Sequence, residues 1–559
     1  MLARMKAPQL PPAFETALHR LRAGAQNVIS RLPGERPPWV VMELSGPIAA
    51  QIRRPRVLGI PLPPALIGGS HSLEEISETL SALGKADWLS GVALRIDGMV
   101  MDPATAFGLR AAISGLRQAG KKTLAYLSRF DLTAQYVASA AEDVVCPESA
   151  DFALHGLGLS MTFYRDALAR FGVRFEKIAI DEYKNAFDTL VRQEMSPAQR
   201  EQLEALLASF EAHYFQEIAS GRGVSVDDLR AAIERGITSA AQAKELKLVD
   251  RIAYEDEVFG RPHKPLEDAR RFLRIPIAPP GSKRIAVVSL TGPIVPGRSR
   301  GAPVPVPPFG GGVAGSDTVV SALRAAAADA RTAAVVFRVD SGGGSALASD
   351  LIWREVKRVR ERKPVIGVMG AVAASGGYYV LAHATRIVAA PTTVTGSIGV
   401  LAGKPVLEGM FEKYGLSAQQ IRRGRYSLLF NPVQPWDDDG RELIERHTRE
   451  VYERFLLRVA EGRKKSRDEV HALGRGHIYS GADAKANGLV DDLGDLRTAV
   501  ELARELSGAG PEAPVWHVAP PHDLLLPSAE DPTTLARLYG DLFRETSLCM
   551  LPAIIDVSA

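Results

Sequence analysis

Short apolar runs rich in β-branched residues alternate along this chain with longer stretches in which apolar side chains recur at helical spacing. The runs expected to form strands include Trp39–Met42, Val92–Asp97, Ile285–Val288 and Val335–Asp340. The stretches expected to be helical include Ser72–Leu83, Ala104–Ala119, Pro197–Ser220, Ser316–Ala330, Ala346–Arg362 and Gly440–Gly462. Strands that alternate with helices are typical of parallel βαβ units, so the pattern predicts an α/β fold.

The two halves of the chain repeat one another. Leu44–Ile48 matches Leu290–Ile294, and Val92–Asp97 matches Val335–Asp340. One offset, 243 residues, relates Arg95 to Arg338, Tyr136 to Tyr379 and Tyr183 to Tyr426. The offset falls to 241 residues toward the end of each copy, as small insertions or deletions in loops explain. Self-similarity at a nearly fixed spacing predicts an internal duplication.

At 559 residues the chain is long enough for more than one domain, at roughly 100–200 residues each. The duplication divides it into an N-terminal amphipathic segment (1–37), a first repeat (38–260), a linker (261–284), a second repeat (285–505) and a C-terminal tail (506–559). The linker and the tail are rich in proline, and the Pro/Gly-rich residues 301–315 are expected to form a mobile loop.

Composition narrows the classes of function. With 46% hydrophobic and 24% charged residues the chain is typical of a soluble globular protein. Its formal net charge of +3 is small for this length and does not indicate nucleic-acid binding. Cys146 and Cys549 are far apart, which argues against a disulfide framework and a cysteine-based zinc site. No metal-ligand cluster, dinucleotide fingerprint or phosphate-binding loop stands out, so no cofactor is expected.

One serine stands in a setting that suits a nucleophile. Ser375 is followed by Gly376 and Gly377, inside residues 364–385, which carry no Asp, Glu, Lys or Arg. A glycine directly after a serine allows a sharp turn and brings a backbone N–H close to whatever the hydroxyl attacks. This layout is expected at the start of a helix, where free N–H groups favour negative charge.

The two copies differ at the residues that would carry chemistry. The position equivalent to Ser375 is Leu132, whereas Lys184, which follows Tyr183, is replaced in the second copy by Ser427. The serine and the lysine each survive in one copy only, so two half-sites could combine into one site. A serine needs a base within hydrogen-bond reach, and a buried lysine can serve because burial favours its neutral form. Arginine could not replace it, since it stays protonated.

A glycine-rich loop follows the strand Val335–Asp340 in the second copy only. It reads Ser341–Ser345 with three consecutive glycines, while the first copy has the bulkier Gly98–Asp102. Backbone N–H groups stabilise the oxyanion that forms when a serine attacks a carbonyl, and Gly343 and Gly376 are the expected donors.

Four motifs, in this order, resemble those of the signal peptide peptidase A family of serine–lysine peptidases, in its long, duplicated form. They are Tyr183–Ala186, Arg338–Ser345, Ala373–Tyr378 and Thr395–Gly399. By this resemblance Ser375 is the nucleophile, Lys184 the general base and Ser397 a residue that holds the lysine, while Gly343 and Gly376 line the oxyanion hole. The resemblance also implies duplicated crotonase-like (Clp-protease-like) repeats with parallel ββα units, a tetramer with an enclosed cavity, and cleavage of leftover signal peptides.

Three features depart from the family. Its loop usually reads Asn-Ser-Pro-Gly-Gly, but Asp340 and Gly342 replace the Asn and the Pro, so this loop is expected to be less preorganised. Asp181 and Glu182 put carboxylates beside Lys184 and would favour a charged amine if they face it. The N-terminal membrane anchor that is common in long members is not visible.

The N-terminal residues and one apolar run indicate where in the cell the protein is expected. Arg4 and Lys6 are followed by prolines and Glu15 instead of an apolar run, so no secretory signal peptide is expected. Residues 364–385 are long enough to cross a bilayer, but four glycines interrupt them and they are expected to be buried in protein. The chain is therefore expected to be peripheral to a membrane or cytoplasmic.

Residues 12–32 are expected to form an amphipathic helix. The apolar face comprises Phe14, Leu18, Leu21, Ala25, Val28 and Leu32. Arginines lie elsewhere around the helix. Such a helix either packs on its own protein or a sister subunit, or lies on anionic lipid.

The sequence leaves alternatives to a peptidase. A crotonase-like acyl-CoA enzyme would share the fold without needing Lys184 beside Ser375, and an inactive assembly or peptide-binding protein would need neither. A Ser-His-Asp hydrolase would depend on His383, whose position in an expected helix indicates a structural role. The prediction is an endopeptidase that needs neither ATP nor metal, forms an acyl-enzyme at Ser375, acts on unfolded or apolar peptides and assembles as a homo-oligomer.

Overall fold

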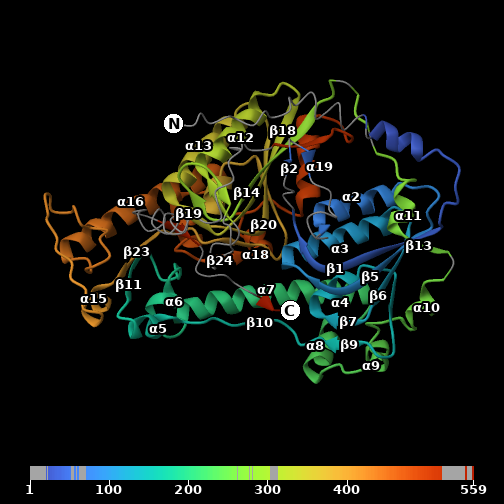
Figure 1. Cartoon of the computed structure of the whole chain (residues 1–559), viewed down its shortest axis with the longest axis horizontal. Helices are drawn as coiled ribbons and strands as arrows, with labels where there is room; N and C mark the ends of the chain where they lie inside the picture. The colour runs from blue at the N-terminus through green and yellow to red at the C-terminus, as the bar shows by residue number, and fades with distance from the viewer. Residues whose placement is uncertain are drawn as a thin grey trace. The chain divides into compact units, whose positions relative to one another are not determined.

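The computed structural model describes residues 21, 23–51, 56–57, 60–61, 71–260, 262–275, 277–279, 281–301, 312–518, 548–550 and 557–558. Contacts divide the chain into two compact units (Figure 1). Unit 1 comprises Met1–Gly158, Phe210–Pro280 and Val557–Ala559, and unit 2 comprises Leu159–Ser209 and Gly281–Asp556. Most of the predicted mobile loop 301–315 and most of the C-terminal tail lie outside the described residues.

Unit 1 is built on a parallel sheet. Along the sheet the strands are β12 (Arg251–Ile252), β8 (Asp143–Cys146), β6 (Lys122–Leu127), β5 (Gly91–Val100), β1 (Trp39–Ala49) and β13 (His263–Pro265), and β4 (His71–Ser72) also pairs with β1. Every one of these pairings is parallel. The connecting helices are α2 (Leu73–Gly84), α3 (Pro103–Gln118), α4 (Leu132–Ala138), α8 (Val226–Arg235), α9 (Ala240–Glu245), α10 (Glu255–Val258) and α11 (Leu266–Arg270).

Unit 2 repeats this plan. Along its larger sheet the strands are β24 (Ile478–Ser480), β22 (Val394–Gly396), β20 (Val365–Ala374), β18 (Thr332–Ser341), β14 (Arg284–Thr291) and β26 (Val515–His517). In addition, β21 (Arg386–Ala389) pairs with β20, and β25 (Asp492–Leu493) pairs with β21. Only β24 pairs in the antiparallel sense among these described strands. Its helices are α12 (Ser316–Ala328), α13 (Ala346–Arg360), α14 (Gly376–Leu381), α16 (Asp438–Arg463), α17 (Arg467–Leu473), α18 (Gly481–Ala486) and α19 (Leu496–Ser507).

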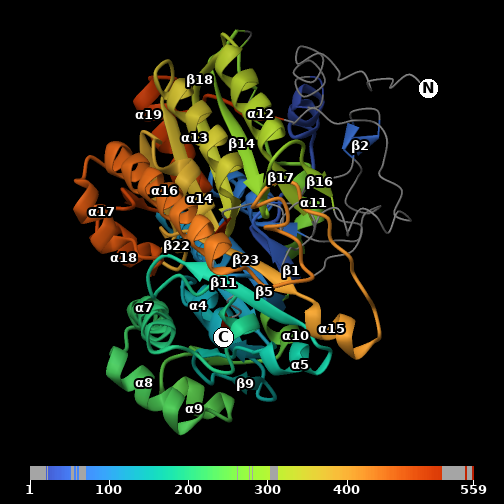
Figure 2. The ribbon, with the colours of Figure 1, turned by 90° about the vertical axis from the view of Figure 1, so that its left-hand side faces the viewer.

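Alternate residues of the central strands in unit 2 face opposite layers, as the two-residue period of a strand requires. Val335, Phe337 and Val339 of β18 join the core with α12, α13, α14 and α16. Ala334 and Val336 face the other way and pack against α19 (Figure 2). Near-continuous apolar strands covered on both faces are typical of parallel sheets, so the predicted α/β class is confirmed.

A second sheet in unit 2 draws on both halves of the sequence. Its strands in order are β11 (Arg174–Ala179), β23 (Leu401–Val406), β27 (Leu548–Met550), β19 (Gly343–Ser345), β15 (Ile294–Val295), β17 (Gly312–Gly315) and β16 (Arg300–Gly301). β11 pairs with β23 along its whole length, from Arg174 opposite Val406 to Ala179 opposite Leu401. The first half of the chain therefore contributes residues 159–209 to the unit that holds the second repeat.

The remaining elements are short except for one helix. They are β2 (Arg56–Val57), β3 (Ile60–Pro61), β7 (Arg129–Asp131), β9 (Asp151–Ala153), β10 (Gly158–Leu159), α5 (Arg165–Arg170), α6 (Asp188–Val191), α15 (Glu408–Lys413), β28 (Val557–Ser558) and the long α7 (Pro197–Arg222). The six helices predicted by range correspond to α2, α3, α7, α12, α13 and α16.

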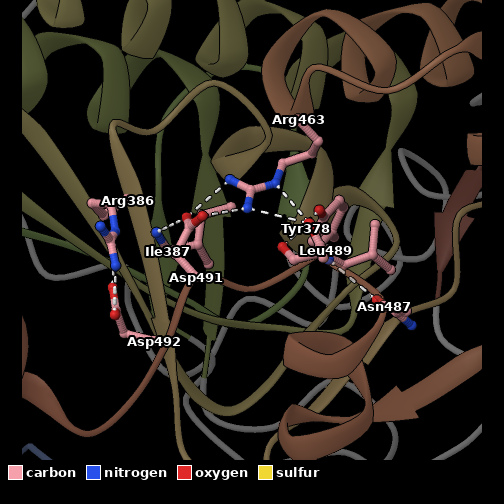
Figure 3. A network of polar contacts seen from close by, with 9 residues as sticks. Tyr378, Arg386, Ile387, Arg463, Asn487, Leu489, Asp491 and Asp492 are labelled. Atoms are coloured by element: carbon pink, nitrogen blue, oxygen red, sulfur yellow. Dashed lines mark hydrogen bonds and ion pairs between the residues drawn. The ribbon is translucent and has the colours of Figure 1, made fainter.

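The duplication extends to individual polar contacts. In unit 2, Arg463 pairs with Asp491, Nη2 to Oδ1 at 2.7 Å, and Asp491 Oδ2 accepts the N–H of Ile387 at 2.7 Å (Figure 3). In unit 1, Arg222 pairs with Asp250 at 2.7 Å, and Asp250 accepts the N–H of Val144 at 2.8 Å. The same contacts at equivalent positions confirm the predicted internal repeat.

One pair in this network has exchanged its charges between the copies. Arg386 on β21 pairs with Asp492 on β25 at 2.6 Å in unit 2 (Figure 3). The equivalent pair in unit 1 is Asp143 on β8 with Arg251 on β12, also at 2.6 Å. A strand added to the wrong copy would therefore bring like charges together, and this disfavours mispairing between repeats.

We expect Arg386→Asp to lower the melting temperature, because it sets two carboxylates opposite each other where an ion pair stood. A partly exposed pair of this kind contributes about 1 kcal/mol. Adding Asp492→Arg recreates the arrangement of unit 1 and should restore most of the loss. Thermal unfolding of both variants tests this, and a double variant no more stable than Arg386→Asp alone would contradict it.

Candidate active site

Ser375 stands at the junction between β20 and α14. Its φ of 54° and ψ of −115° place it outside the conformations that ordinary residues prefer, so the turn is strained. Its N–H donates to the carbonyl of Gly396 at 2.8 Å, and its side chain makes no capping bond to α14. The hydroxyl is thus held at a sharp strand-to-helix turn, as predicted, and is fully buried.

Lys184 lies in the loop after β11 and reaches the same point from the other half of the sequence. Its Nζ lies 2.8 Å from Ser375 Oγ, 2.9 Å from Ser397 Oγ and 3.0 Å from the Ser397 carbonyl oxygen. The lysine side chain has no exposed surface. A buried amine is stable only when hydrogen bonded, and these three oxygens supply that requirement.

Ser397 follows β22 and also has a left-handed backbone, with φ of 49°. Its N–H donates to the carbonyl of His477 at 2.6 Å, which fixes the turn that presents both of its oxygens to Lys184. Three of the side chains singled out in the sequence, Ser375, Lys184 and Ser397, therefore meet in one buried cluster.

The glycine-rich loop packs closely against α14, the helix that begins directly after Ser375. Ser341 on β18 lies opposite Ala373 on β20, and a Cβ at Gly377 would approach the Ser341 carbonyl oxygen to 2.3 Å. Gly343 has a φ of 101°, which favours glycine, and its N–H donates to Ser341 Oγ at 3.1 Å. Gly376 is the first residue of α14. The loop and the helix start thus lie side by side.

Asp340 is one of the two residues that depart from the family loop, and its carboxylate makes two hydrogen bonds beside this loop. Its Oδ1 accepts the N–H of Val372 at 3.3 Å, and its Oδ2 accepts from Arg338 at 3.2 Å. Of the carboxylates beside the lysine, Glu182 forms an ion pair with Arg475. Asp181 has a φ of 62° at the start of this turn.

One buried amide behind Lys184, that of Gln202, was not anticipated from the sequence. Gln202 on α7 donates to the Tyr183 carbonyl at 3.3 Å and to Asn185 Oδ1 at 2.5 Å, and it accepts the N–H of Ile478 at 3.1 Å. These hydrogen bonds of Gln202 connect the loop that carries Lys184 to β24, the strand that follows His477. The only signal in the sequence is a glutamine on the apolar side of an expected helix.

The loop Gly474–His477 covers the other side of the lysine. Gly476 has a φ of 86°, and a Cβ there would lie 2.5 Å from the backbone nitrogen of Lys184. Its N–H donates to the Ile398 carbonyl at 2.9 Å. Gly476 thus permits close packing of its loop against the backbone of Lys184.

His383 is not part of this cluster. Its Nδ1 accepts from Trp353 Nε1 at 2.8 Å, and its Nε2 lies 3.4 Å from Glu461. Burial lowers the pKa of His383, since its charged form loses water. These contacts give it a packing role beneath α14. Within the described ranges, no group of three or more His, Cys, Asp or Glu is placed to hold a metal ion.

We expect Gly476→Ala to lower the melting temperature more than Gly508→Ala. Both glycines have positive φ, 86° and 62°, but a Cβ at Gly508 would meet nothing within 4 Å. The backbone strain alone costs about 1–2 kcal/mol, and overlap adds about 1–3 kcal/mol at Gly476 only. Thermal unfolding of the two variants gives the comparison. Equal losses would show that Gly476 is not tightly packed on Lys184.

Comparison with known proteins identifies the family to which the chain belongs. Residues 115–267 and 357–510 each match peptidase family S49, so the domain occurs once in each repeat. The chain is 30% identical over 449 residues to the chloroplastic serine protease SPPA of Arabidopsis thaliana, covering 78% of this chain and 65% of that protein. It is 29% identical over 466 residues to protease 4 of Salmonella typhi, covering 80% of this chain and 71% of the relative.

Protease 4 of Haemophilus influenzae is 29% identical over 456 residues, covering 74% of this chain and 70% of the relative. Among solved structures, a ClpP1 mutant from Listeria monocytogenes is similar over 38% of this chain and 94% of its own, at 14% identity and a TM-score of 0.25. The resemblance drawn from the four motifs is confirmed by the two family matches. On these matches, the chain belongs to peptidase family S49.

Proposed function

We propose that the protein is a serine endopeptidase that works through a Ser375–Lys184 dyad and an acyl-enzyme. The observation that carries the proposal is the 2.8 Å separation of Lys184 Nζ from Ser375 Oγ, two side chains that are both fully buried. Membership of a peptidase family and the names of the relatives support the same reaction.

In the acylation step, Ser375 Oγ attacks the carbonyl carbon of a peptide bond while Lys184 Nζ accepts the hydroxyl proton. The tetrahedral intermediate carries its charge on the former carbonyl oxygen, where the N–H groups of Gly343 and Gly376 can donate. The protonated lysine then gives its proton to the leaving amine. In deacylation a water molecule attacks the ester while Lys184 again takes the proton, and the serine is restored.

The lysine can act as a base only when it is neutral. Burial favours the neutral amine because the ammonium ion loses its hydration. Ser397 offers two oxygens to Nζ, at 2.9 and 3.0 Å, and these orient the amine toward Ser375. Gly343 N–H is now occupied by Ser341 Oγ at 3.1 Å, so this bond must be shared or given up when an oxyanion forms.

We propose unfolded or apolar peptides, including residual signal peptides, as the substrates, and a homo-oligomer as the working form. The resemblance to signal peptide peptidase A supports both, with a tetramer as the assembly that it implies. The competing proposal is a catalytically inactive assembly or peptide-binding protein. An intact serine, amine and second serine in hydrogen-bond contact favour the enzyme.

We expect Ser375→Ala and Lys184→Ala each to reduce kcat for an apolar peptide by at least about a thousandfold, because nucleophile and base act as one unit. Lys184→Arg should be equally inactive, since arginine stays protonated. A serine-reactive phosphonate should label the wild type at Ser375. His383→Gln, which changes a histidine outside the cluster, is the matched control. Normal turnover in the Ser375→Ala and Lys184→Ala variants would refute the dyad.

We also propose peripheral contact with an anionic membrane through the N-terminal helix. In its described part, Gln26 and Asn27 donate to the carbonyls of Arg270 and Ile275 at 2.9 Å. The apolar residues on the remaining surface are exposed: Leu21, Val28, Ile29 and Leu32. Within the described residues, Leu21, Val28 and Leu32 of the predicted apolar face are thus largely exposed on unit 1. Across the described residues, none of the helices has the length and hydropathy needed to cross a bilayer.

We expect Val28→Glu combined with Leu32→Glu to weaken sedimentation with vesicles that contain phosphatidylglycerol, because two charges enter the apolar face. Leu506→Glu, at an exposed apolar site on unit 2, is the control and should bind as the wild type does. If the double variant still sediments normally but loses its oligomeric state, the helix contacts a sister subunit.

A further inference from the structure

A group of buried polar side chains lies beside the loop that carries Lys184. Its members are Asn185, Asp188, Ser196 and Gln202, and all of them are buried. The proposed mechanism uses none of these side chains. Buried amides and carboxylates cost free energy unless they are hydrogen bonded, so a group of them at one place needs an explanation.

Asn185, the residue after the base, joins the members of this group. Its Nδ2 donates to the carbonyl oxygen of Glu182 at 3.0 Å and to Asp188 Oδ2 at 3.1 Å, and its Oδ1 accepts from Gln202 Nε2 at 2.5 Å. Asp188 in turn forms an ion pair with Lys177 on β11, and both side chains are largely buried. Asn185 thus connects the lysine loop to β11, α6 and α7.

Gln202 holds the backbone on both sides of the amine. Its Nε2 donates to the carbonyl of Tyr183, the residue before the base, at 3.3 Å. Its Oε1 accepts the N–H of Ile478 at 3.1 Å, and Ile478 lies opposite Gly396, the residue before Ser397, where β24 pairs with β22. One side-chain amide therefore links the backbone that carries the base to the strand pair that carries its acceptor.

This link matters because lysine has a long, flexible side chain, and the place of its amine depends on where its backbone is held. The stem of Lys184 is closely packed, since a Cβ at Gly399 would lie 3.1 Å from Lys184 Cδ. A lysine loop that moved outward would carry the amine away from Ser375 and toward water. Water stabilises the ammonium ion, which cannot accept a proton.

We propose that Asn185 and Gln202 are positioning residues for the general base: their paired amides hold the lysine loop against β24 and thereby keep the Lys184 amine neutral and directed at Ser375. The inference rests on the proposed peptidase function and adds the residues that make its base effective. Neither amide takes part in a bond-making step. A buried network of this kind is rigid when every member is paired and loses that rigidity when one member is removed.

The test is Gln202→Met, which keeps the length of the side chain and removes its hydrogen bonds. Gln199→Met is the matched control, because Gln199 is also fully buried on α7 but its Nε2 contacts Met161 Sδ at 3.3 Å. Among the described residues, Gln199 Oε1 has no hydrogen-bond partner, so little is lost with it. Asn185→Ala is a second variant that leaves α7 unchanged, and it carries the test if Gln202→Met does not fold.

Gln202→Met should lower kcat about a hundredfold with KM unchanged, because a base misplaced by about 1 Å costs about that factor while the substrate contacts persist. The acid limb of kcat/KM should move to higher pH by about one unit, since the amine gains access to water. Asn185→Ala should act in the same direction, and Gln199→Met should keep the kcat and the acid limb of the wild type. A wild-type kcat and acid limb in the folded Gln202→Met and Asn185→Ala variants would overturn the proposal.

The charged groups around the lysine loop keep their charges in these variants, because each substitution replaces one neutral side chain by another. These groups are Glu182 with Arg475, Asp188 with Lys177 and Arg192, Glu201 on the Tyr183 hydroxyl, and His477 beside the Tyr183 ring. A shift of the acid limb therefore reports the exposure of the amine to water, and a loss of stability alone would not produce it.

A readout without turnover separates this inference from the proposed function. In the inactive Ser375→Ala background, amide hydrogen exchange at Ile478 and in residues 183–186 should be faster with Gln202→Met than with Gln199→Met. Faster exchange supports the positioning role even if no variant hydrolyses peptide, an outcome that would count only against the peptidase. Equal exchange at both places would rule the positioning role out.

Discussion

A buried amine needs hydrogen-bond acceptors, and this requirement governs the organisation of unit 2. Lys184 has no exposed surface, and its acceptors are Ser375 and Ser397, both from the second half of the sequence. An amine left without them would cost about 1–3 kcal/mol or more. Residues 159–209 therefore belong with the second repeat, where pairing of β11 with β23 and the amide of Gln202 hold the lysine loop in place.

The two copies have diverged at the position of Ser375. At the position of Ser375 the first repeat has Leu132, which is buried in the core of unit 1. The residue before it, Asp131, caps α4 by accepting the N–H of Ala134. In the second repeat no side chain caps α14 at Ser375, so the N–H groups at its start remain available. The first copy has kept the α/β plan but has neither the serine nor the uncapped helix start at this turn.

The sequence predicted the parallel units because they depend on local patterns, apolar runs and helical spacing, that repeat along the chain. It predicted that Ser375 and Lys184 meet because the two copies differ at these positions, and the resemblance of the motifs to a family added Ser397. It did not predict the roles of Gln202 or Gly476, since a buried glutamine and a tightly packed glycine look ordinary until distant loops meet. The strand Leu548–Met550 was missed for a similar reason, because a three-residue run in a proline-rich tail has no signal of its own.

The central claim is that one chain supplies both the serine and the lysine of a single site. The most direct measurement is peptide hydrolysis by mixed oligomers, made by co-expressing differently tagged Ser375→Ala and Lys184→Ala chains and purified through both tags. If each site is built within one chain, every site lacks one of the two groups and the mixed oligomer is inactive. Recovery of a substantial fraction of wild-type turnover would show that the serine and the lysine come from different chains, and would contradict the account.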